Sequence, residues 1–184
     1  PFALTGGFTG PEQPTGAVPQ YDEELNSWSA PFVMAAINTK NIHRSNFLLG
    51  HQYGEDFRYD EMLLTGDGEQ GKAAAEYVAK DDSIGKSDLQ PGDGPTQEER
   101  ENGNYDAIFA GQNSEGELMI SSVQGDRDPG YGSTSKMLAE AAICLLENPT
   151  LASGGLWTPA AAMGQALIDR LHAHAGLTFQ IEKG

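Results

Sequence analysis

The last third of the chain contains two helical patterns and a strand pattern, each with clear boundaries. The first helix is predicted from a start near Ser133 or Thr134 to Asn148-Pro149, by the spacing of Met137, Leu138, Ala141, Ala142 and Leu145. Thr158-Pro159, an N-cap residue followed by proline at the first helical position, predicts a second helix that ends at Gly176. Leu177, Phe179 and Ile181 then alternate with polar residues, which predicts a strand with one buried and one wet face.

Four upstream segments complete the predicted fold. Residues 105–110 and 117–123 flank a polar, Gly-containing turn and predict an antiparallel hairpin. The apolar run at residues 31–37 predicts a strand, after which Asn38 or Thr39 would cap a helix through Ile42 and Leu49. Residues 56–64 alternate, with Phe57, Tyr59, Glu61 and Leu63 on one face, and predict another strand. We therefore expect an α+β fold with a mixed, mostly antiparallel sheet packed against helices.

The chain also contains a literal dinucleotide-loop pattern, Gly66-Asp67-Gly68-Glu69-Gln70-Gly71. Such a loop must lie between a strand and a helix that leads to a second parallel strand. A helix to Lys80 is predicted, but residues 81–95 offer only Ile84 and Leu89 as large apolar residues, and the preceding strand is too charged for a buried parallel sheet. The interpretation is a plain turn with a Gly-rich helix start, and no cofactor-binding residue in this chain.

Composition limits the classes of partner. The chain has 184 residues, and 11 Lys+Arg against 27 Asp+Glu give a net charge of -16, which disfavours nucleic acid and anionic membranes. No apolar run is long enough to span a bilayer. The single cysteine, Cys144, lies on the apolar side of its helix and fits a structural thiol and a reducing, cytoplasmic setting. His43, His51, His172 and His174 show no metal-ligand spacing, so no metal is expected.

The domain organisation is predicted from turn-rich segments. Residues 1–20 are rich in Gly, Pro and Thr, which predicts an extended junction segment before one domain at residues 21–184. Thr96 and Glu99 have capping-box spacing for a short solvated helix. The chain begins at Pro1 without Met or a signal peptide, so we expect a piece of a longer protein.

Three polar clusters are candidate sites. Asn38, Arg44, Ser45 and Asn46 follow the apolar run and fit either capping and solvation or ligand contact. Arg58 lies in an aromatic stretch, where it could clamp a carboxylate or form a cross-strand ion pair. The turn at residues 126–132 would deliver Tyr131 and free backbone N–H groups to a helix N-terminus, which suits an anion, although a loop with one packed tyrosine explains it nearly as well.

Four segments together resemble a known family. Residues 31–46 (PFVMAAINTKNIHRSN), 53–61 (YGEDFRYDE), 128–146 (DPGYGSTSKMLAEAAICLL) and 154–171 (GGLWTPAAAMGQALIDRL) resemble the C-terminal half of saccharopine dehydrogenase-like oxidoreductases, a group that includes trans-acting enoyl reductases. The resemblance covers roughly Trp28 to the end of the chain. It implies an N-terminal Rossmann domain that binds NAD(P) and is missing here, followed by a substrate-binding and dimerisation domain.

The resemblance implies a function for the intact protein. That function is an NAD(P)-dependent oxidoreductase that moves hydride to or from a small-molecule or lipid-like substrate, while this chain alone is expected to be inactive. The candidate catalytic residues are Tyr131, Tyr59 and Asp128, and the candidate substrate-binding residues are Asn38, Arg44, Ser45, Arg58 and Tyr131. A homodimer is the expected assembly. The alternative is a non-catalytic dimerisation or protein-interaction module derived from the same family.

Overall fold

The computed structural model describes residues 1–81, 92–148 and 153–183. The chain divides into two compact units, Pro1–Asp88 (unit 1) and Leu89–Gly184 (unit 2). Each unit has one three-stranded antiparallel sheet, which confirms the predicted α+β class with antiparallel pairing. Among the described residues, no Rossmann fold is present and no helix has the length and apolar character needed to cross a membrane.

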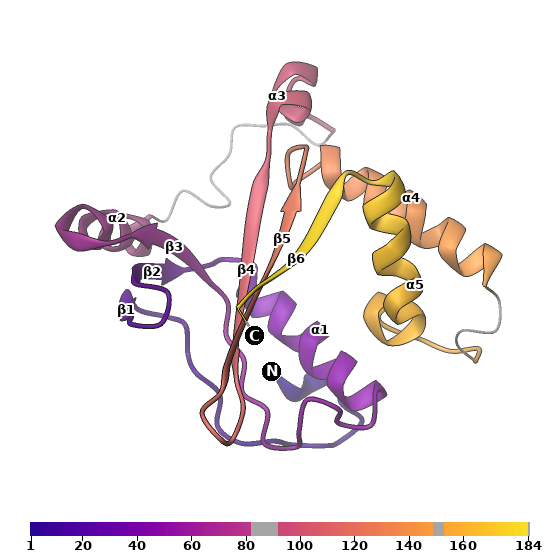
Figure 1. The fold of residues 1–184 in the computed structure, drawn as a ribbon, viewed down its shortest axis with the longest axis horizontal. Coiled ribbons are helices and arrows are strands. Elements are labelled where there is room, and N and C mark those ends of the chain that lie inside the picture. The colour runs from indigo at the N-terminus through magenta and orange to yellow at the C-terminus, as the bar shows by residue number, and fades with distance from the viewer. Residues whose placement is uncertain (82–91, 149–152, 184) are drawn as a thin grey trace. The chain divides into compact units, whose positions relative to one another are not determined.

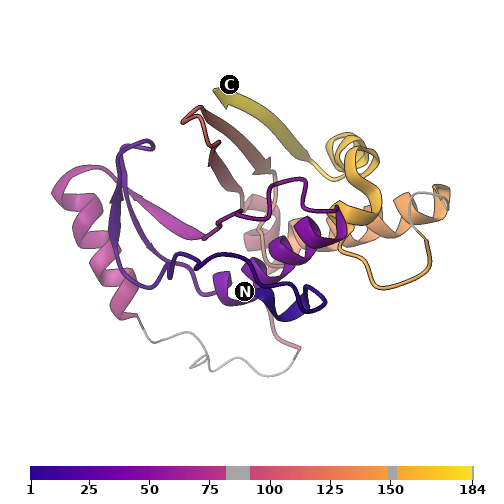
Figure 2. The same cartoon turned by 90° about the horizontal axis from the view of Figure 1, so that it is seen from below.

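Unit 1 is built on a small sheet and two helices. Its strands are β1 (Gln20–Asp22), β2 (Ser27–Pro31) and β3 (Met62–Gly66), with β2 in the centre. Helix α2 (Gly68–Lys80) packs on β2 and β3 and buries Ala75 completely. These strands and α2 lie on the left in Figure 2, in indigo to purple.

The strand predicted at residues 31–37 is wrong. Strand β2 ends at Pro31, and helix α1 (Ala35–Leu48) begins four residues later, with Met34 as its N-cap residue. The predicted cap Thr39 instead lies inside α1, where its hydroxyl donates to the carbonyl oxygen of Ala35 at 2.7 Å. Pro31 pairs with Met62, the first residue of β3, so the pairing of β2 with β3 ends at these two residues.

The strand predicted at residues 56–64 is correct only at its end. Pairing with β2 begins at Met62, and residues 57–61 are irregular. The aromatic residues of this segment pack instead on α1. The Phe57 ring lies 5.6 Å from the ring of His43 and stacks at 6.1 Å on the ring of Tyr59, centroid to centroid.

Residues 1–20 also pack on α1. A short 3-10 helix, η1 (Phe2–Leu4), brings the Phe2 ring to 4.6 Å from the His43 ring, centroid to centroid. The buried Thr5 hydroxyl lies 2.8 Å and 2.7 Å from the carbonyl oxygens of Phe2 and Phe8, and it closes this turn. The segment is therefore tied to α1 by ring contacts and by hydrogen bonds.

Unit 2 confirms most of the sequence prediction. The hairpin of β4 (Tyr105–Gln112) and β5 (Leu118–Gly125) pairs with β6 (Leu177–Lys183), and the three strands run side by side in Figure 1. Helices α4 (Gly132–Glu147) and α5 (Pro159–His174) begin and end close to the predicted residues. The short α3 (Gln97–Asn102) has the predicted capping box, with both Thr96–Glu99 hydrogen bonds formed.

The core of unit 2 lies between α4, α5 and the start of β6. Its buried side chains are Cys144, Ala162, Met163, Leu167, Leu171, Ala175 and Leu177. The burial of Cys144 agrees with a structural thiol. On the face of β6 that was predicted to be buried, Leu177 is buried and Phe179 is only partly buried. Ile181 is 73% exposed, because the core ends before the strand does.

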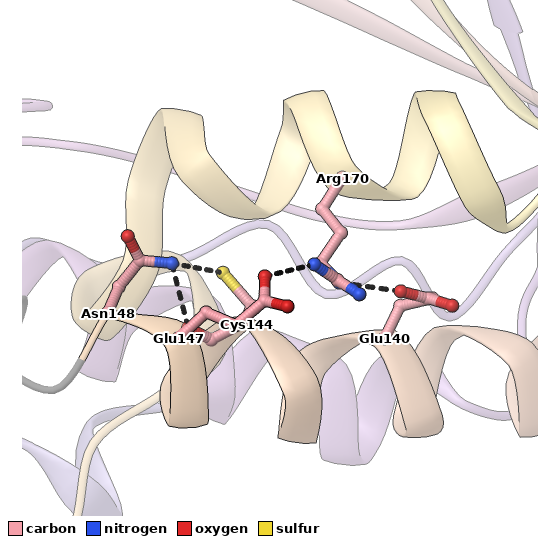
Figure 3. Close-up of polar contacts among 5 residues, drawn as sticks. All are labelled: Glu140, Cys144, Glu147, Asn148 and Arg170. Carbon is pink, nitrogen blue, oxygen red and sulfur yellow. Dashed lines mark hydrogen bonds and ion pairs between the residues drawn. The ribbon is translucent and has the colours of Figure 1, made fainter.

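Ion pairs of Arg170 join helices α4 and α5. Arg170 of α5 lies between Glu140 and Glu147 of α4, with 2.6 Å between its Nε and an oxygen of Glu140 (Figure 3). The Arg170 and Glu140 side chains are 19% and 17% exposed, so this pair is better shielded from water than a surface ion pair. Asn148 ends α4 by donating to the Cys144 carbonyl oxygen at 2.9 Å.

Helix α5 is interrupted at Gly164. This residue has φ 49° and ψ -127°, a conformation that is open essentially only to glycine. The interruption separates a first turn, which carries Ala162 and Met163, from the longer part that carries Leu167 and Leu171. All four side chains still reach the same core.

Candidate functional site

Unit 1 contains a cavity of about 610 Å³. Its walls are residues 9–16, residues 59–61, Phe32 before α1, and four residues of the first turns of α1, Ala35, Ala36, Thr39 and Lys40; Pro1 and Phe2 also line it. The volume falls in the range of small-molecule sites, roughly 300 to 1,000 Å³. Phe2, Phe32, Ala35 and Ala36 give it apolar walls, and Tyr59 is the only predicted site residue that lines it.

Tyr59 is the candidate proton donor of this cavity. Burial, followed by the negative charges of Glu61 and Asp60, raises the pKa of Tyr59 to about 12. The backbone N–H of Tyr59 donates to Gln13 Oε1 at 3.0 Å, which fixes the start of this wall. Like an ordinary tyrosine, Tyr59 is a neutral phenol at neutral pH and can donate a hydrogen bond, and its raised pKa makes it a weaker acid than an exposed tyrosine.

The pKa of Tyr59 predicts a loss of stability in alkali. The unfolded phenol ionises near pH 10, whereas the folded phenol resists ionisation until about pH 12, so the stability of unit 1 falls as the pH rises above about 10. We expect the thermal midpoint of the wild type to fall more steeply between pH 9 and 11 than that of Tyr59→Phe. Tyr77→Phe, at a tyrosine that is 75% exposed, should follow the wild type. Parallel curves for the wild type and Tyr59→Phe would contradict the burial of this phenol.

Gln13, which lines the cavity, links residues 9–16 to α1 and was not found by sequence analysis. Its side-chain N–H groups donate to the carbonyl oxygens of Pro11 and Phe57, and its Oε1 lies 3.1 Å from Nε2 of His43. With Oε1 as the acceptor, Nε2 of His43 carries the proton. His43 is 3% exposed, and burial lowers its pKa, which favours the neutral ring. Nothing in the sequence around Gln13 marks it as different from other loop residues.

The residues of the predicted cluster on α1 form hydrogen bonds within the protein. Asn38 donates to Glu61 Oε1 at 2.9 Å, the Ser45 hydroxyl donates to the Asn41 carbonyl oxygen, and Arg44 donates to the Leu4 carbonyl oxygen at 2.7 Å. Arg58 is exposed and has no ion-pair partner among the described residues. These four residues do not line the cavity. Their role as substrate ligands stays a prediction.

The turn at residues 126–132 does not offer free N–H groups. The Asp128 carboxylate accepts hydrogen bonds from the backbone N–H groups of Gly130, Tyr131 and Gly132. The bond from Tyr131 is the main reason why the pKa of Asp128 lies below its ordinary value. The predicted anion site is therefore already filled by a side chain of the protein.

Tyr131 and Asp128 lie together in unit 2, at the start of α4. The Tyr131 side chain is 56% exposed. The other predicted site residues, Asn38, Arg44, Ser45, Arg58 and Tyr59, all belong to unit 1. The catalytic roles of Tyr131 and Asp128 stay a prediction.

The glycine pattern adopts part of the geometry of a dinucleotide loop. Gly66 and Gly68 have φ 93° and 67°, and Gly71 lies so close to the Gly66 carbonyl that a Cβ atom would overlap it. However, β3 pairs antiparallel with β2, and the Asp67 carboxylate accepts the Gly68 N–H at 2.6 Å. The start of α2 thus carries negative charge where a pyrophosphate would have to lie. In the part of the chain that is described, no cluster of three His, Cys, Asp or Glu residues could hold a metal ion.

Similar proteins share one name. A protein of Mycobacterium tuberculosis strain H37Rv, whose name includes the words trans-acting enoyl reductase, is 36% identical over 172 residues, which cover 83% of this chain and 41% of the relative. The trans-acting enoyl reductase of Mycobacterium ulcerans is 32% identical over 163 residues, covering 78% of this chain and 39% of the relative. The trans-acting enoyl reductase of Mycobacterium bovis is 31% identical over 199 residues, which cover 93% of this chain and 47% of the relative.

The chain therefore spans less than half the length of the curated relatives that it matches. No protein-family model matches the chain, and no solved structure matches it.

Proposed function

We propose that this chain is the substrate-binding or dimerisation portion of a saccharopine dehydrogenase-like, NAD(P)-dependent oxidoreductase whose nicotinamide-binding domain lies outside it. The shared name of the relatives supports an oxidoreductase-related function, and specifically the reduction of an enoyl group. The observation that carries the proposal is the unit 1 cavity, in which a protonated tyrosine borders apolar walls.

The chemistry of enoyl reduction gives Tyr59 a defined role. Reduction of a C=C bond conjugated to a carbonyl adds a hydride at the β carbon and a proton at the α carbon. The nicotinamide supplies the hydride when it is bound. Tyr59 would donate its hydrogen bond to the carbonyl oxygen or its proton to the α carbon, and water would then reprotonate the phenolate. The apolar side chains of Phe2, Phe32, Ala35 and Ala36 would hold the acyl chain.

The residues of this chain do not fit a bound dinucleotide. The glycine pattern of residues 66–71 follows an antiparallel strand, and Asp67 itself accepts the first N–H group of α2. A pyrophosphate would have to displace that carboxylate and lie next to Glu69, which also belongs to the first turn of α2. We therefore assign no cofactor-binding residue to this chain.

A calorimetric titration with NADPH and NADH tests this assignment. We expect no binding by the purified chain at millimolar cofactor. Micromolar binding that is lost in Gly68→Val would make residues 66–71 a cofactor loop and would refute the proposal. If no cofactor binds, the next titration uses a 2-enoyl thioester, for which we expect binding that weakens in Tyr59→Phe.

A second candidate is a non-catalytic dimerisation or protein-interaction module, which one surface favours. Helix α4 presents apolar side chains on the side that does not reach the core, with Leu138, Leu145 and Leu146 exposed by 72%, 47% and 81%. A run of leucines this exposed is typical of an interaction surface. No charged residue lies between these positions on that side of the helix.

Sedimentation velocity tests the exposed face of α4 as a dimer interface, and binding of an enoyl thioester separates the two candidates. The dimerisation module predicts a concentration-dependent dimer that becomes monomeric in the double variant Leu138→Asp and Leu146→Asp. Circular dichroism should show unchanged helix content, because neither side chain supports the core. A monomer at every concentration, combined with binding of an enoyl thioester, would leave the substrate-binding role as the explanation.

A further inference from the structure

The cavity of unit 1 is lined by more acidic than basic side chains. Glu12, Asp60 and Glu61 line it, whereas Lys40 is the only basic side chain among the residues that line it. The two arginines that the sequence offered as carboxylate ligands, Arg44 and Arg58, do not line it. Negative charge at the wall of a partly enclosed site disfavours an anionic ligand, because water there screens the repulsion poorly.

Glu61 adds an unused hydrogen-bond acceptor. Its Oε1 accepts from Asn38 at 2.9 Å, but its Oε2 is enclosed and has no hydrogen-bond partner among the described residues. Leaving a carboxylate oxygen unpaired in this way costs free energy, which a donor from a ligand can recover. Glu61 also lines the cavity, so a ligand bound there lies beside this carboxylate.

We propose that the unit 1 cavity binds an apolar ligand with an N–H donor directed at Glu61, an amide or an amine, and rejects the corresponding free carboxylate. The apolar part of the ligand lies against Phe2, Phe32 and Ala36, and the nitrogen donates to Glu61 Oε2. The inference deepens the proposed function and rests on it for the location of the ligand. It adds a second feature of the ligand, the N–H donor, which that function does not specify.

A matched pair of ligands tests the inference on the purified chain. Ligand-observed NMR titrations at pH 8 would compare trans-2-octenamide with trans-2-octenoate, which share one carbon skeleton. We expect the amide to bind at least ten-fold more tightly. In Glu61→Gln this ratio should fall at least five-fold, because the charge and the strongest acceptor are both lost. Glu69→Gln, which removes one exposed charge from α2, should leave the ratio unchanged.

Ala36→Phe controls for the location of the ligand. Ala36 lines the cavity and its side chain is exposed, so the larger ring should fill the cavity and abolish amide binding without unfolding α1. Equal or tighter binding of the carboxylate, no binding of the amide, or amide binding that survives in Ala36→Phe would each overturn the inference. None of these results requires reduction, so the inference and the enoyl reductase proposal can fail separately.

Discussion

Gly71→Ala is expected to destabilise unit 1 by about 3 kcal/mol, the upper end of the cost of overpacking. A Cβ atom at this position would overlap the carbonyl group of Gly66, which belongs to the backbone and cannot rotate away. The first turn of α2 would have to move off β3. That movement would also break the hydrogen bond from the Thr65 hydroxyl to the Gly71 carbonyl oxygen, which measures 2.9 Å.

Urea unfolding followed by far-UV circular dichroism measures this effect. Gly111→Ala, in β4 of unit 2, is the control for an added methyl group without a clash, because no atom lies within 4 Å of the new Cβ. A control variant close to wild type beside a strongly destabilised Gly71→Ala would support the tight strand–helix packing. A Gly71→Ala variant as stable as wild type would show that α2 can shift at little cost.

Leu167→Ala is expected to destabilise unit 2 by about 3 kcal/mol, within the range for large-to-small changes in a core. Leu167 is 9% exposed and belongs to the cluster between α4, α5 and β6. Its removal leaves a cavity that the interrupted helix α5 can close only in part. The expected loss is a large share of the stability of a small unit.

Leu146→Ala is the control for this effect. It makes the same change inside α4, at a leucine that is 81% exposed, so helix propensity changes equally while burial does not. We expect the control to lie within about 0.5 kcal/mol of the wild type in the same urea experiment. A loss at Leu146 as large as that at Leu167 would mean that the exposed face of α4 is covered in solution.

Unit 2 could be predicted from the sequence because its boundaries are set by local chemistry. Thr158-Pro159 begins α5, Gly176 ends it with φ 72°, and Asn148 ends α4. The hairpin was also predicted from local sequence, and the ends of both predicted strands lie within two residues of the observed ends.

Unit 1 was harder to predict because helix α1 buries polar residues and exposes an apolar one. This helix buries His43, Ser45 and Asn46, while Ile37 is 54% exposed. Strand β2 likewise buries Ser27 and Ser29, and the Ser29 hydroxyl donates to the Gln20 carbonyl oxygen at 3.2 Å. Polar residues that satisfy their hydrogen bonds internally look like surface residues in a sequence. For this reason the apolar residues 31–37 were predicted to form a strand.

The residues of the candidate site could likewise be predicted from the sequence only in part. Tyr59 was selected from its aromatic context, and the structure places it at the cavity. Gln13 and Glu61 could not be selected, because their importance depends on contacts with Phe57, His43 and Asn38 that are distant in the sequence. The N–H groups near Tyr131 were expected to be free, because no sequence rule shows that the Asp128 carboxylate turns back on them.

The two tryptophans of the chain are divided between its two units. Trp28 lies in β2, with its ring 5.6 Å from the Tyr21 ring and beneath the ammonium group of Lys72, whereas Trp157 precedes α5 and donates from its indole nitrogen to the Ser153 carbonyl oxygen. Each unit thus carries its own fluorophore in a distinct environment. Single-tryptophan variants would report the emission of each unit separately and would show whether the two units unfold as one cooperative body or as independent ones.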